Sequence, residues 1–513
     1  MSSSSHVHQD PKRTLKVFSF NVWGLAIISK DRKVRIRAIA EHLASSSYDI
    51  VCLQELWVYK DYELVREIVA QSLPFSRFFH TGALGSGLAI FTRFPLISAQ
   101  ALPYSLSGSP AQAFAGDFFV KKAAANVVIL HPLLGEVEIW TNHMHAAGEH
   151  PPDTRQAHRI AQSWQLANAI RGGAAKGRYI LCMGDFNAQP FSVPIAILRS
   201  HAGLTDSFLE THPTANDASS SRPSAQEAIQ SFGMTCDSPL NTYSAGKPIP
   251  ENISSQGGKR LDYIFYRQPA VARRRPLIWG YRDDAVNSFS EGEAELEEGK
   301  PMPKSLETAP QLRCVKSEVI LTENVPGQRF SYSDHFALLS TFRIDTPDHA
   351  HSDTKAGNGS KDTKFTPLVP LLNEPEPLND TTTTFAPIPS GQSPRVNQES
   401  ASSTDEKSAV IRSALNTLRL YTRISQHTAK QHLRFFGGAV LALIALTVGS
   451  AWQPKSWLQP IFTLLGGLLG AAGATFLYTG FVWGRWELGL LTETTEEMEL
   501  ELRVVEMEER GRE

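Results

Sequence analysis

The chain has 513 residues, enough for roughly two to four domains, and a formal net charge of −2. A charge this close to zero excludes an overall polybasic character, so we expect no nucleic-acid partner. The four cysteines lack the spacing of metal ligands. Cys52 and Cys182 lie inside apolar runs, which predicts reduced core thiols in a reducing compartment. Residues 1–13 are polar without an apolar core, so we expect a disordered N-terminus and no secretory signal peptide.

The next part of the chain alternates between strand and helix patterns. Alternating or continuous apolar runs predict strands at residues 15–22, 48–53, 87–91, 127–130, 137–142, 179–183, 260–266 and 336–344. Apolar residues at helical spacing predict helices at residues 35–43, 62–73 and 155–171. Polar residues gather where the strands end. The pattern predicts one α/β (α+β) domain over residues 14–345, with its site at one rim of the sheets.

Three segments of distinct composition interrupt or follow this domain. Residues 291–298 are acidic, for which we consider a solvated loop first and a regulatory or membrane-facing element second. Residues 346–407 are rich in Pro, Ser, Thr, Asn and Asp, which is typical of a disordered linker. Residues 408–434 predict a basic amphipathic helix. Its basic residues include Arg412, Arg419, Arg423, Lys430 and Arg434.

Two uncharged apolar stretches, residues 435–452 and 461–483, each approach the ~20 residues that a helix needs to cross a bilayer. A short link joins them, so we expect a transmembrane hairpin; the alternative is a pair of buried core helices. The second stretch offers small residues for close helix packing. These residues are Gly466, Gly467, Gly470, Ala471, Gly473 and Ala474.

Charges around the hairpin predict its orientation. Basic residues crowd before the hairpin and Arg485 follows it. The positive-inside rule then places both the large domain and the acidic tail at 484–513 in the cytosol. We therefore expect an integral protein of an internal membrane, such as the endoplasmic reticulum or the mitochondrial outer membrane.

Oxygen-bearing side chains follow several predicted strands. Glu55 supplies a carboxylate and Asn21 an amide oxygen, and Mg²⁺ prefers such ligands. Asp185 and Asn187 supply a second carboxylate and an amide that can donate to a phosphate oxygen. Each of these residues taken alone also suits a turn or a helix cap, so only their combination indicates a site.

Histidines complete the set. His143 and His145 share one face if their strand continues, because strand side chains alternate. His335 stands between a polar loop and an apolar strand, with Asp334 directly before it. A carboxylate that orients an imidazole makes a general base, so this pair is the candidate proton acceptor.

Six sequence motifs together resemble the endonuclease/exonuclease/phosphatase, or DNase I-like, superfamily. They are Phe20-Asn21-Val22-Trp23-Gly24, Leu53-Gln54-Glu55, Asn142-His143, Gly184-Asp185-Phe186-Asn187, Arg260-Leu261-Asp262-Tyr263-Ile264 and Ser333-Asp334-His335. Within this superfamily, the sequences of the motifs most resemble those of the neutral sphingomyelinases and the fungal inositol phosphosphingolipid phospholipases C. The resemblance implies a four-layer αββα sandwich, here followed by the membrane hairpin.

The resemblance also implies roles for individual residues. Glu55, helped by Asn21, would hold Mg²⁺, with Mn²⁺ as an alternative ion. His335 would be the base that activates water. The other residues implied to act in catalysis are Asp334, Asp185, Asn187, His143 and His145. Asp117 and Lys122 match a pair that this branch links to substrate engagement and activation, and Asp262 would orient the metal cluster or His335.

The implied activity is hydrolysis of a sphingolipid phosphodiester to ceramide and a phosphorylated head group. Anionic phospholipids would activate the enzyme through the basic helix. A nuclease or an inositol polyphosphate phosphatase of the same fold is the alternative. The head group, inositol phosphate or phosphocholine, and the oligomeric state stay open.

Overall fold

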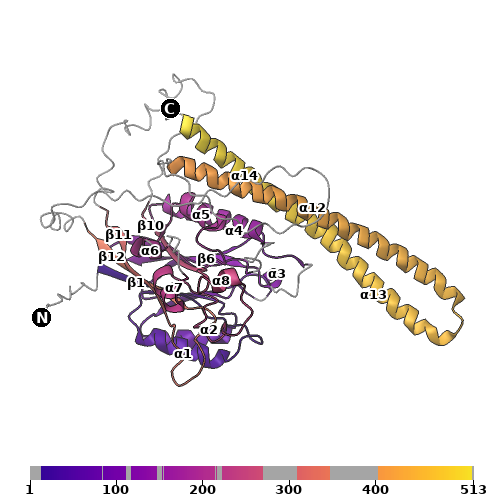
Figure 1. Ribbon diagram of the computed structural model, residues 1–513, viewed down its shortest axis with the longest axis horizontal. Helices are drawn as coiled ribbons and strands as arrows, with labels where there is room; N and C mark the ends of the chain where they lie inside the picture. The colour runs from indigo at the N-terminus through magenta and orange to yellow at the C-terminus, as the bar shows by residue number, and fades with distance from the viewer. Residues whose placement is uncertain are drawn as a thin grey trace.

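The computed structural model describes residues 13–83, 85–110, 117–146, 153, 155–213, 215, 222–269, 309–346 and 403–510. The acidic run at 291–298, residues 1–12 and most of the predicted linker lie outside these residues. The described chain forms two six-stranded sheets packed face to face, helices on their outer sides, and a long helical hairpin (Figure 1).

The strand order gives two mixed sheets. The first sheet runs β11 (Gln311–Ile320), β12 (Ala337–Asp345), β1 (Thr14–Asn21), β2 (Ile50–Gln54), β4 (Leu88–Thr92) and β3 (Phe75–Phe79). The second runs β5 (Leu96–Pro103), β6 (Ala123–His131), β7 (Gly135–His143), β8 (Tyr179–Asp185), β10 (Asp262–Arg267) and β9 (Thr205–Asp206). The central strands are buried on both faces, which explains their continuous apolar sequences.

Helices cover both outer faces. α1 (Arg32–Ser45) and α2 (Tyr59–Val69) pack on the first sheet, and α4 (Gln156–Ala174) and α5 (Val193–Ser200) pack on the second. Short helices complete the domain: α3 (Asp117–Val120), α6 (Ser207–Thr211), α7 (Ala225–Phe232) and α8 (Glu251–Ser254). The predicted four-layer αββα sandwich is confirmed.

The two faces of β2 show how the sequence fills the layers. Ile50 and Cys52 point into the core between the sheets, whereas Val51 and Leu53 point into the core beneath α1 and α2. All four side chains are fully buried. Burial of an aliphatic side chain of this size contributes roughly 1.5–3 kcal/mol, so the apolar run stabilises both interfaces at once.

The strand directions bring six strand ends to one rim. β1 runs parallel to β2, and β7 runs parallel to β8, so their carboxyl ends lie together. β12 is antiparallel to β1 and β10 is antiparallel to β8, so β12 and β10 begin at the same rim. This topology gathers the polar residues that end or precede these strands.

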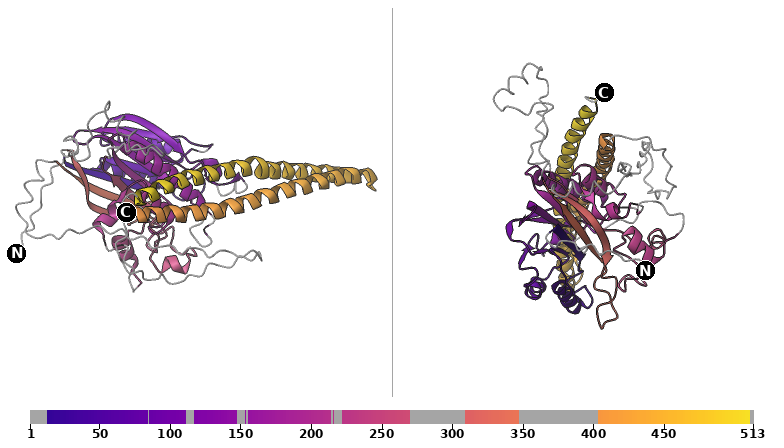
Figure 2. Two further views of the ribbon diagram at one scale, coloured as in Figure 1. Left: turned by 90° about the horizontal axis from the view of Figure 1, so that it is seen from above. Right: turned by 90° about the vertical axis from the view of Figure 1, so that its left-hand side faces the viewer.

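The C-terminal part is a helical hairpin. Its elements are α12 (Ser403–Gly449), the 3₁₀ turns η3 (Ser450–Trp452) and η4 (Ser456–Leu458), α13 (Gln459–Leu477), the π-helical turn η5 (Tyr478–Trp483) and α14 (Gly484–Arg510). The expected basic helix and first apolar stretch form one uninterrupted helix, α12. Figure 2 shows the hairpin extending well beyond the sandwich.

The far half of the hairpin is apolar and exposed. Two helical segments are long and apolar enough to cross a membrane. In their most apolar stretches, the buried share is 0% for the first and 6% for the second, which argues against two core helices. The small-residue face is used only in part: Gly473 lies against Ala439, whereas Gly467 and Gly470 have open space where a Cβ would be.

The near half of the hairpin docks on the sandwich. Leu415 and Leu418 of α12 and Met498 of α14 belong to the same apolar cluster as α4 and α5, and the hairpin lies on the outer side of these two helices (Figure 1). The hydroxyl group of Tyr421 accepts a hydrogen bond from Arg155 at 2.7 Å, and the indole N–H of Trp164 donates to Glu497 at 2.9 Å. The apolar residues in the first part of the basic helix are therefore covered by protein, whereas Leu420 and Ile424 are exposed.

Acidic residues of α14 pair with the basic face of α12. Arg412 contacts Glu506 at 2.9 Å, and Arg419 contacts Glu499 at 2.8 Å. The acidic tail thus neutralises basic residues far from the apolar stretches. Residues nearer to these stretches remain exposed, namely Arg423, Lys430 and Arg434.

Candidate active site

The rim of the sandwich gathers chemically capable residues from both sheets. Each lies at or next to a strand end: Asn21 ends β1, Glu55 follows β2, His143 ends β7, Asp185 ends β8, Asp262 begins β10 and His335 lies two residues before β12. Except for Glu55, whose side chain is 16% exposed, these residues are almost fully buried. The partly exposed carboxylate marks the side from which a substrate can approach.

Asn21 connects the two sheets at this rim. Its Nδ2 donates to Glu55 Oε1 at 3.2 Å and to Asp185 Oδ2 at 2.9 Å. Its Oδ1 accepts from the backbone N–H of Trp23 at 3.0 Å, and this unambiguous donor fixes the orientation of the amide. Asn21 therefore positions the two carboxylates, and its oxygen is turned away from the place where the sequence led us to expect a metal ligand.

Three non-glycine residues around the site have left-handed backbone conformations. Trp23, Glu55 and Asn187 have φ values of 47°, 58° and 47°. Such conformations cost of order 1 kcal/mol or more and persist where the surroundings impose them. Gly24 is part of those surroundings, because a Cβ there would lie 2.5 Å from the carbonyl oxygen of Glu55.

His335 is held by a carboxylate from the other sheet. Its Nδ1 donates to Asp262 Oδ2 at 2.8 Å, and its Nε2 lies 3.9 Å from Asp185 Oδ2. Burial lowers the pKa of His335, but the Cys236 sulfur and the Asp262 carboxylate raise it well above its usual value. Burial raises the pKa of Asp185 to about 7, against the opposing influence of His335.

The expectation that Asp334 orients His335 is corrected by this geometry. Asp334 accepts from the hydroxyl group of Ser333 at 3.3 Å, and burial raises its pKa. Residues 332–334 form a bend before β12, and the Asp334 carboxylate is bonded to Ser333 within it. Asp262, 73 residues away, holds the ring instead.

His143 and Lys122 form a second pair in the site. Lys122 Nζ lies 2.6 Å from His143 Nε2. This histidine nitrogen lies 3.7 Å from Glu55 Oε1 and 3.6 Å from Asp185 Oδ2. Burial and then the positive charge of Lys122 lower the pKa of His143 well below its usual value, so the ring is neutral. Lys122 follows α3, which begins at Asp117, whose side chain lies outside the described residues.

Two expected residues face elsewhere. β7 ends at His143, so the alternation that would align His145 with it stops there. The ring of His145 lies 5.4 Å from that of His158 on α4. The side-chain amide of Asn187 donates to the carbonyl group of Met144 at 3.1 Å, and its backbone N–H donates to Asp185 Oδ1 at 2.8 Å. Asn187 thus fixes the strand end that carries Asp185.

The donor atoms at the rim fit a hard divalent cation. Glu55 and Asp185 offer carboxylate oxygens that accept from the same amide nitrogen, and Mg²⁺ is often bound by one or two carboxylates with water and substrate completing its shell. Asp185, Asp262 and His335 also lie close enough to share an ion. However, Asp262 Oδ2 and His335 Nδ1 already bind each other, so the Glu55–Asp185 pair fits the cation better.

An αββα sandwich with acidic, amide and histidine side chains at one rim defines a hydrolase-like site suited to phosphate esters. Residues 18–335 match the Endonuclease/Exonuclease/phosphatase family, and the chain belongs to this family. The family predicted from the six motifs is confirmed.

Curated proteins with similar sequences indicate the branch of the family to which this chain is most similar. The chain is 29% identical over 494 residues to "Inositol phosphosphingolipids phospholipase C" of Schizosaccharomyces pombe, which covers 94% of this chain and 93% of that protein. It is 33% identical over 354 residues to the protein of the same name from Saccharomyces cerevisiae, covering 64% of each. It is 30% identical over 253 residues to human "Sphingomyelin phosphodiesterase 2", covering 49% of this chain and 56% of that protein. The first match includes most of the hairpin.

Proposed function

We propose that this protein is a membrane-anchored phospholipase C that hydrolyses the phosphodiester of a sphingolipid to ceramide and a phosphorylated head group. The names of the relatives described above support the lipid substrate, and the site supports hydrolysis at phosphorus. The observation that carries the proposal is the convergence of Glu55, Asp185 and the His335–Asp262 pair at one partly open rim.

Glu55 and Asp185 would hold Mg²⁺ or Mn²⁺, with Asn21 fixing the spacing of the two carboxylates. The bound ion would supply Lewis-acid stabilisation of charge on a phosphoryl or leaving oxygen. Burial raises the pKa of the Asp185 carboxyl group, and a cation held between it and the partly exposed Glu55 would favour its charged form. Activity should therefore depend on a divalent ion.

His335 would accept the proton of the attacking water at Nε2. The Asp262 carboxylate accepts from Nδ1–H, fixes the tautomer that leaves Nε2 free as a base, and stabilises the imidazolium that forms. The raised pKa of His335 makes it a stronger base and leaves more of it protonated at low pH. The rate should accordingly rise with pH through the pKa of His335.

Lys122 and His143 would bind the phosphoryl oxygens. The Lys122 ammonium group is buried 2.6 Å from Nε2 of the neutral His143 ring, and that ring nitrogen lies 3.7 Å from Glu55 Oε1 and 3.6 Å from Asp185 Oδ2. Hydrogen-bond donors held in a dry site stabilise developing negative charge more strongly than donors in water do. Lys122 and His143 are therefore placed to bind a negatively charged phosphate oxygen more strongly than a neutral group.

The hairpin would anchor the enzyme in the bilayer that contains its substrate. Tethering raises the effective concentration of substrate without any new contact. The exposed residues Arg423, Lys430 and Arg434 flank the apolar stretches, where each can gain roughly 1 kcal/mol from an anionic leaflet. We propose activation by anionic phospholipids and a cytosolic catalytic domain on an internal membrane.

The test uses the full-length protein in mixed micelles with Mg²⁺. Labelled inositol-phosphoceramide, sphingomyelin, single-stranded DNA and an inositol polyphosphate are supplied separately. We expect ceramide release from a sphingolipid, loss of it with EDTA, and no turnover by His335→Ala. Nucleotide or inorganic phosphate release without ceramide would instead favour the nuclease or phosphatase alternative.

A further inference from the structure

The turn that follows β1 exposes two adjacent isoleucines beside the catalytic rim. Ile27 is 96% exposed and Ile28 is 71% exposed. In the rest of the sandwich, as far as the structure describes it, the most exposed large apolar side chain is Leu130 at 55%. Single exposed apolar residues are ordinary on a protein surface, but neighbouring ones at the tip of a turn indicate a contact surface.

Hydrogen bonds hold this turn in one shape. The backbone N–H of Leu25 donates to Ser29 Oγ at 2.9 Å, and the N–H of Ser29 donates to the carbonyl oxygen of Leu25 at 3.3 Å. The buried guanidinium group of Arg35 donates to the carbonyl groups of Trp23, before the turn, and Lys30, after it, at 2.7 and 2.9 Å. The turn is therefore fixed at both ends, and its apolar tip is held away from the domain.

The same turn is attached to the proposed metal site. The backbone N–H of Trp23 donates to Asn21 Oδ1 at 3.0 Å, and the N–H of Gly24 donates to the carbonyl oxygen of Glu55 at 2.8 Å. Whatever surface the tip contacts is therefore held next to Glu55, the partly exposed carboxylate of the site.

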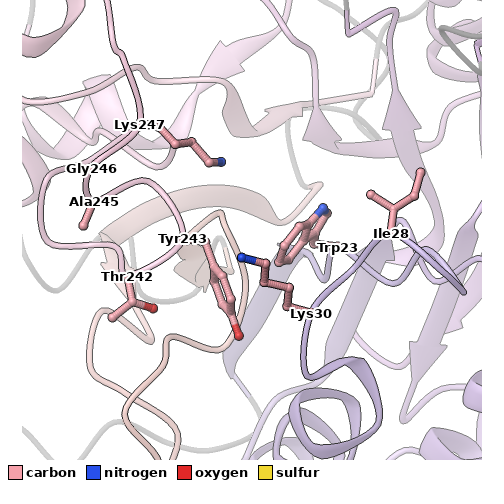
Figure 3. Close-up of a pocket in the computed structure, with 8 residues that line it drawn as sticks. All are labelled: Trp23, Ile28, Lys30, Thr242, Tyr243, Ala245, Gly246 and Lys247. Carbon is pink, nitrogen blue, oxygen red and sulfur yellow. The ribbon is translucent and has the colours of Figure 1, made fainter.

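A cavity of about 320 Å³ separates the turn from residues 242–247. Figure 3 shows Ile28 on one side of this cavity and Tyr243 on the other. The charges around the tip are mixed, because Lys30 is followed by Asp31, whose carboxylate accepts from the Tyr243 hydroxyl group at 3.3 Å. The apolar character of the tip, and not its net charge, therefore indicates the kind of partner that it fits.

The hairpin indicates which surface lies in front of the tip. At the end of the second apolar stretch, the Trp483 ring centroid lies 5.2 Å from that of Phe118 in α3, and the Trp486 ring centroid lies 5.9 Å from Lys121 Nζ. The next residue, Lys122, belongs to the catalytic rim. Figure 1 shows α3 on the side of the sandwich toward which the hairpin extends. A bilayer that encloses the apolar stretches therefore begins next to the rim.

We propose that Ile27 and Ile28 insert into the leaflet that carries the hairpin and hold the catalytic rim against the lipid surface. Transfer of an aliphatic side chain from water to hydrocarbon is favourable roughly in proportion to its exposed area, and most of the area of both side chains is exposed. This inference rests on the proposed membrane-anchored phospholipase C and adds a second membrane contact, made by the catalytic domain itself.

Fluorescence quenching by spin-labelled lipid tests the insertion directly. Full-length Ile28→Cys protein is labelled with nitrobenzoxadiazole and reconstituted in phosphatidylcholine vesicles that contain the quencher, and wild-type protein treated alike corrects for the natural cysteines. Ile97→Cys is the matched control, because Ile97 is 53% exposed on β5 at the end of the sheet far from the rim. We expect the lipid to quench the label at position 28 and to leave the label at position 97 unchanged.

Activity gives an independent readout of the same contact. Ile27→Ser with Ile28→Ser should lower kcat/KM for a sphingolipid in the vesicle surface about tenfold, equal to 1.4 kcal/mol. The same variant should keep the wild-type kcat/KM for a water-soluble, short-chain sphingolipid. Ile97→Ser should change neither value, and Ile27→Leu with Ile28→Leu should retain both because leucine is equally apolar.

Two results would overturn the insertion. A tip covered by another protein or by a second copy of the chain would be shielded from the quencher, so that positions 28 and 97 respond alike. A serine variant that loses activity equally on both substrates would show a structural role for the turn instead. Ceramide release from neither substrate by the wild type would contradict the proposed phospholipase C activity, whereas quenching at position 28 would still report the insertion.

Discussion

The pair formed by His335 and Asp262 allows a prediction that separates two candidate carboxylates. Asp262→Asn keeps the shape of the side chain but removes the charge that faces His335 Nδ1 at 2.8 Å. A hydrogen bond to a charged group contributes about 1.5–3 kcal/mol, so kcat/KM should fall about 10- to 150-fold. The matched control is Asp334→Asn, which removes the carboxylate adjacent to His335 in the sequence.

The pH profile gives the second readout of this prediction. Asp262 raises the pKa of His335, and the base works only when neutral, so the wild-type rate rises with pH around that raised pKa. Removing the Asp262 charge lowers the pKa of His335, and the acid limb of the kcat/KM profile should therefore move to lower pH while the maximum falls. Asp334→Asn should move it much less.

The assay is initial-rate ceramide release in micelles between pH 5 and 9, with thermal unfolding of each variant as a control for folding. A folded Asp262→Asn enzyme with an unshifted acid limb would refute the assigned pair. So would a larger shift in Asp334→Asn than in Asp262→Asn.

Three other predictions follow from the structure. Glu55→Gln should raise the Mg²⁺ concentration for half-maximal activity about tenfold or more, whereas an unchanged Mg²⁺ titration would exclude Glu55 as a ligand. Burial and Arg171 lower the pKa of His201 to about 3, so below pH 6.5 the unfolded chain binds a proton more readily than the folded chain does. The free energy of unfolding should therefore fall by about 2 kcal/mol between pH 7 and pH 5. His201→Gln should flatten this pH dependence, and an equal slope in both proteins would contradict the prediction. Neutralising Arg423, Lys430 and Arg434 together should reduce the activation of the enzyme by anionic phospholipid in vesicles. Full activation of that variant would show that the basic residues of α12 do not bind the anionic leaflet.

The fold could be predicted from the sequence where strands are buried on both faces. Runs such as residues 179–183 are apolar throughout because β8 has a core on each side. The strands that the sequence did not predict are β3, β5, β9 and β11, and all four are edge strands. Edge strands carry exposed polar side chains, as Arg313 and Lys316 show in β11, so their apolar pattern is weak.

The candidate site was predictable as a set of residues but less so as a set of contacts. The motifs at strand ends identified Asn21, Glu55, Asp185 and His335, because parallel strands end at a common rim. The resemblance also implied that Asp262 would orient the metal cluster or His335, but the choice between Asp262 and Asp334 as the partner of His335 depends on the antiparallel register of β10 and β8, which pairs Asp262 with Asp185. A register between strands distant in sequence leaves no local signal in either strand.

The docking of the hairpin had no signal in the sequence either. The contact between Trp164 of α4 and Glu497 of α14 joins residues 333 positions apart. The pattern of residues 408–434 predicted a basic amphipathic helix, but an amphipathic pattern does not say whether protein or membrane covers the apolar residues. In the structure Leu415 and Leu418 are covered by the sandwich.

Hydrolysis in ¹⁸O-labelled water tests the central claim most directly. Water activated by His335 at a divalent-ion site should attack phosphorus and leave the ceramide oxygen intact. Mass spectrometry should therefore find one ¹⁸O in the released phosphorylated head group and none in ceramide, with His335→Ala giving neither product. Label in ceramide, or normal labelled product from His335→Ala, would contradict the account.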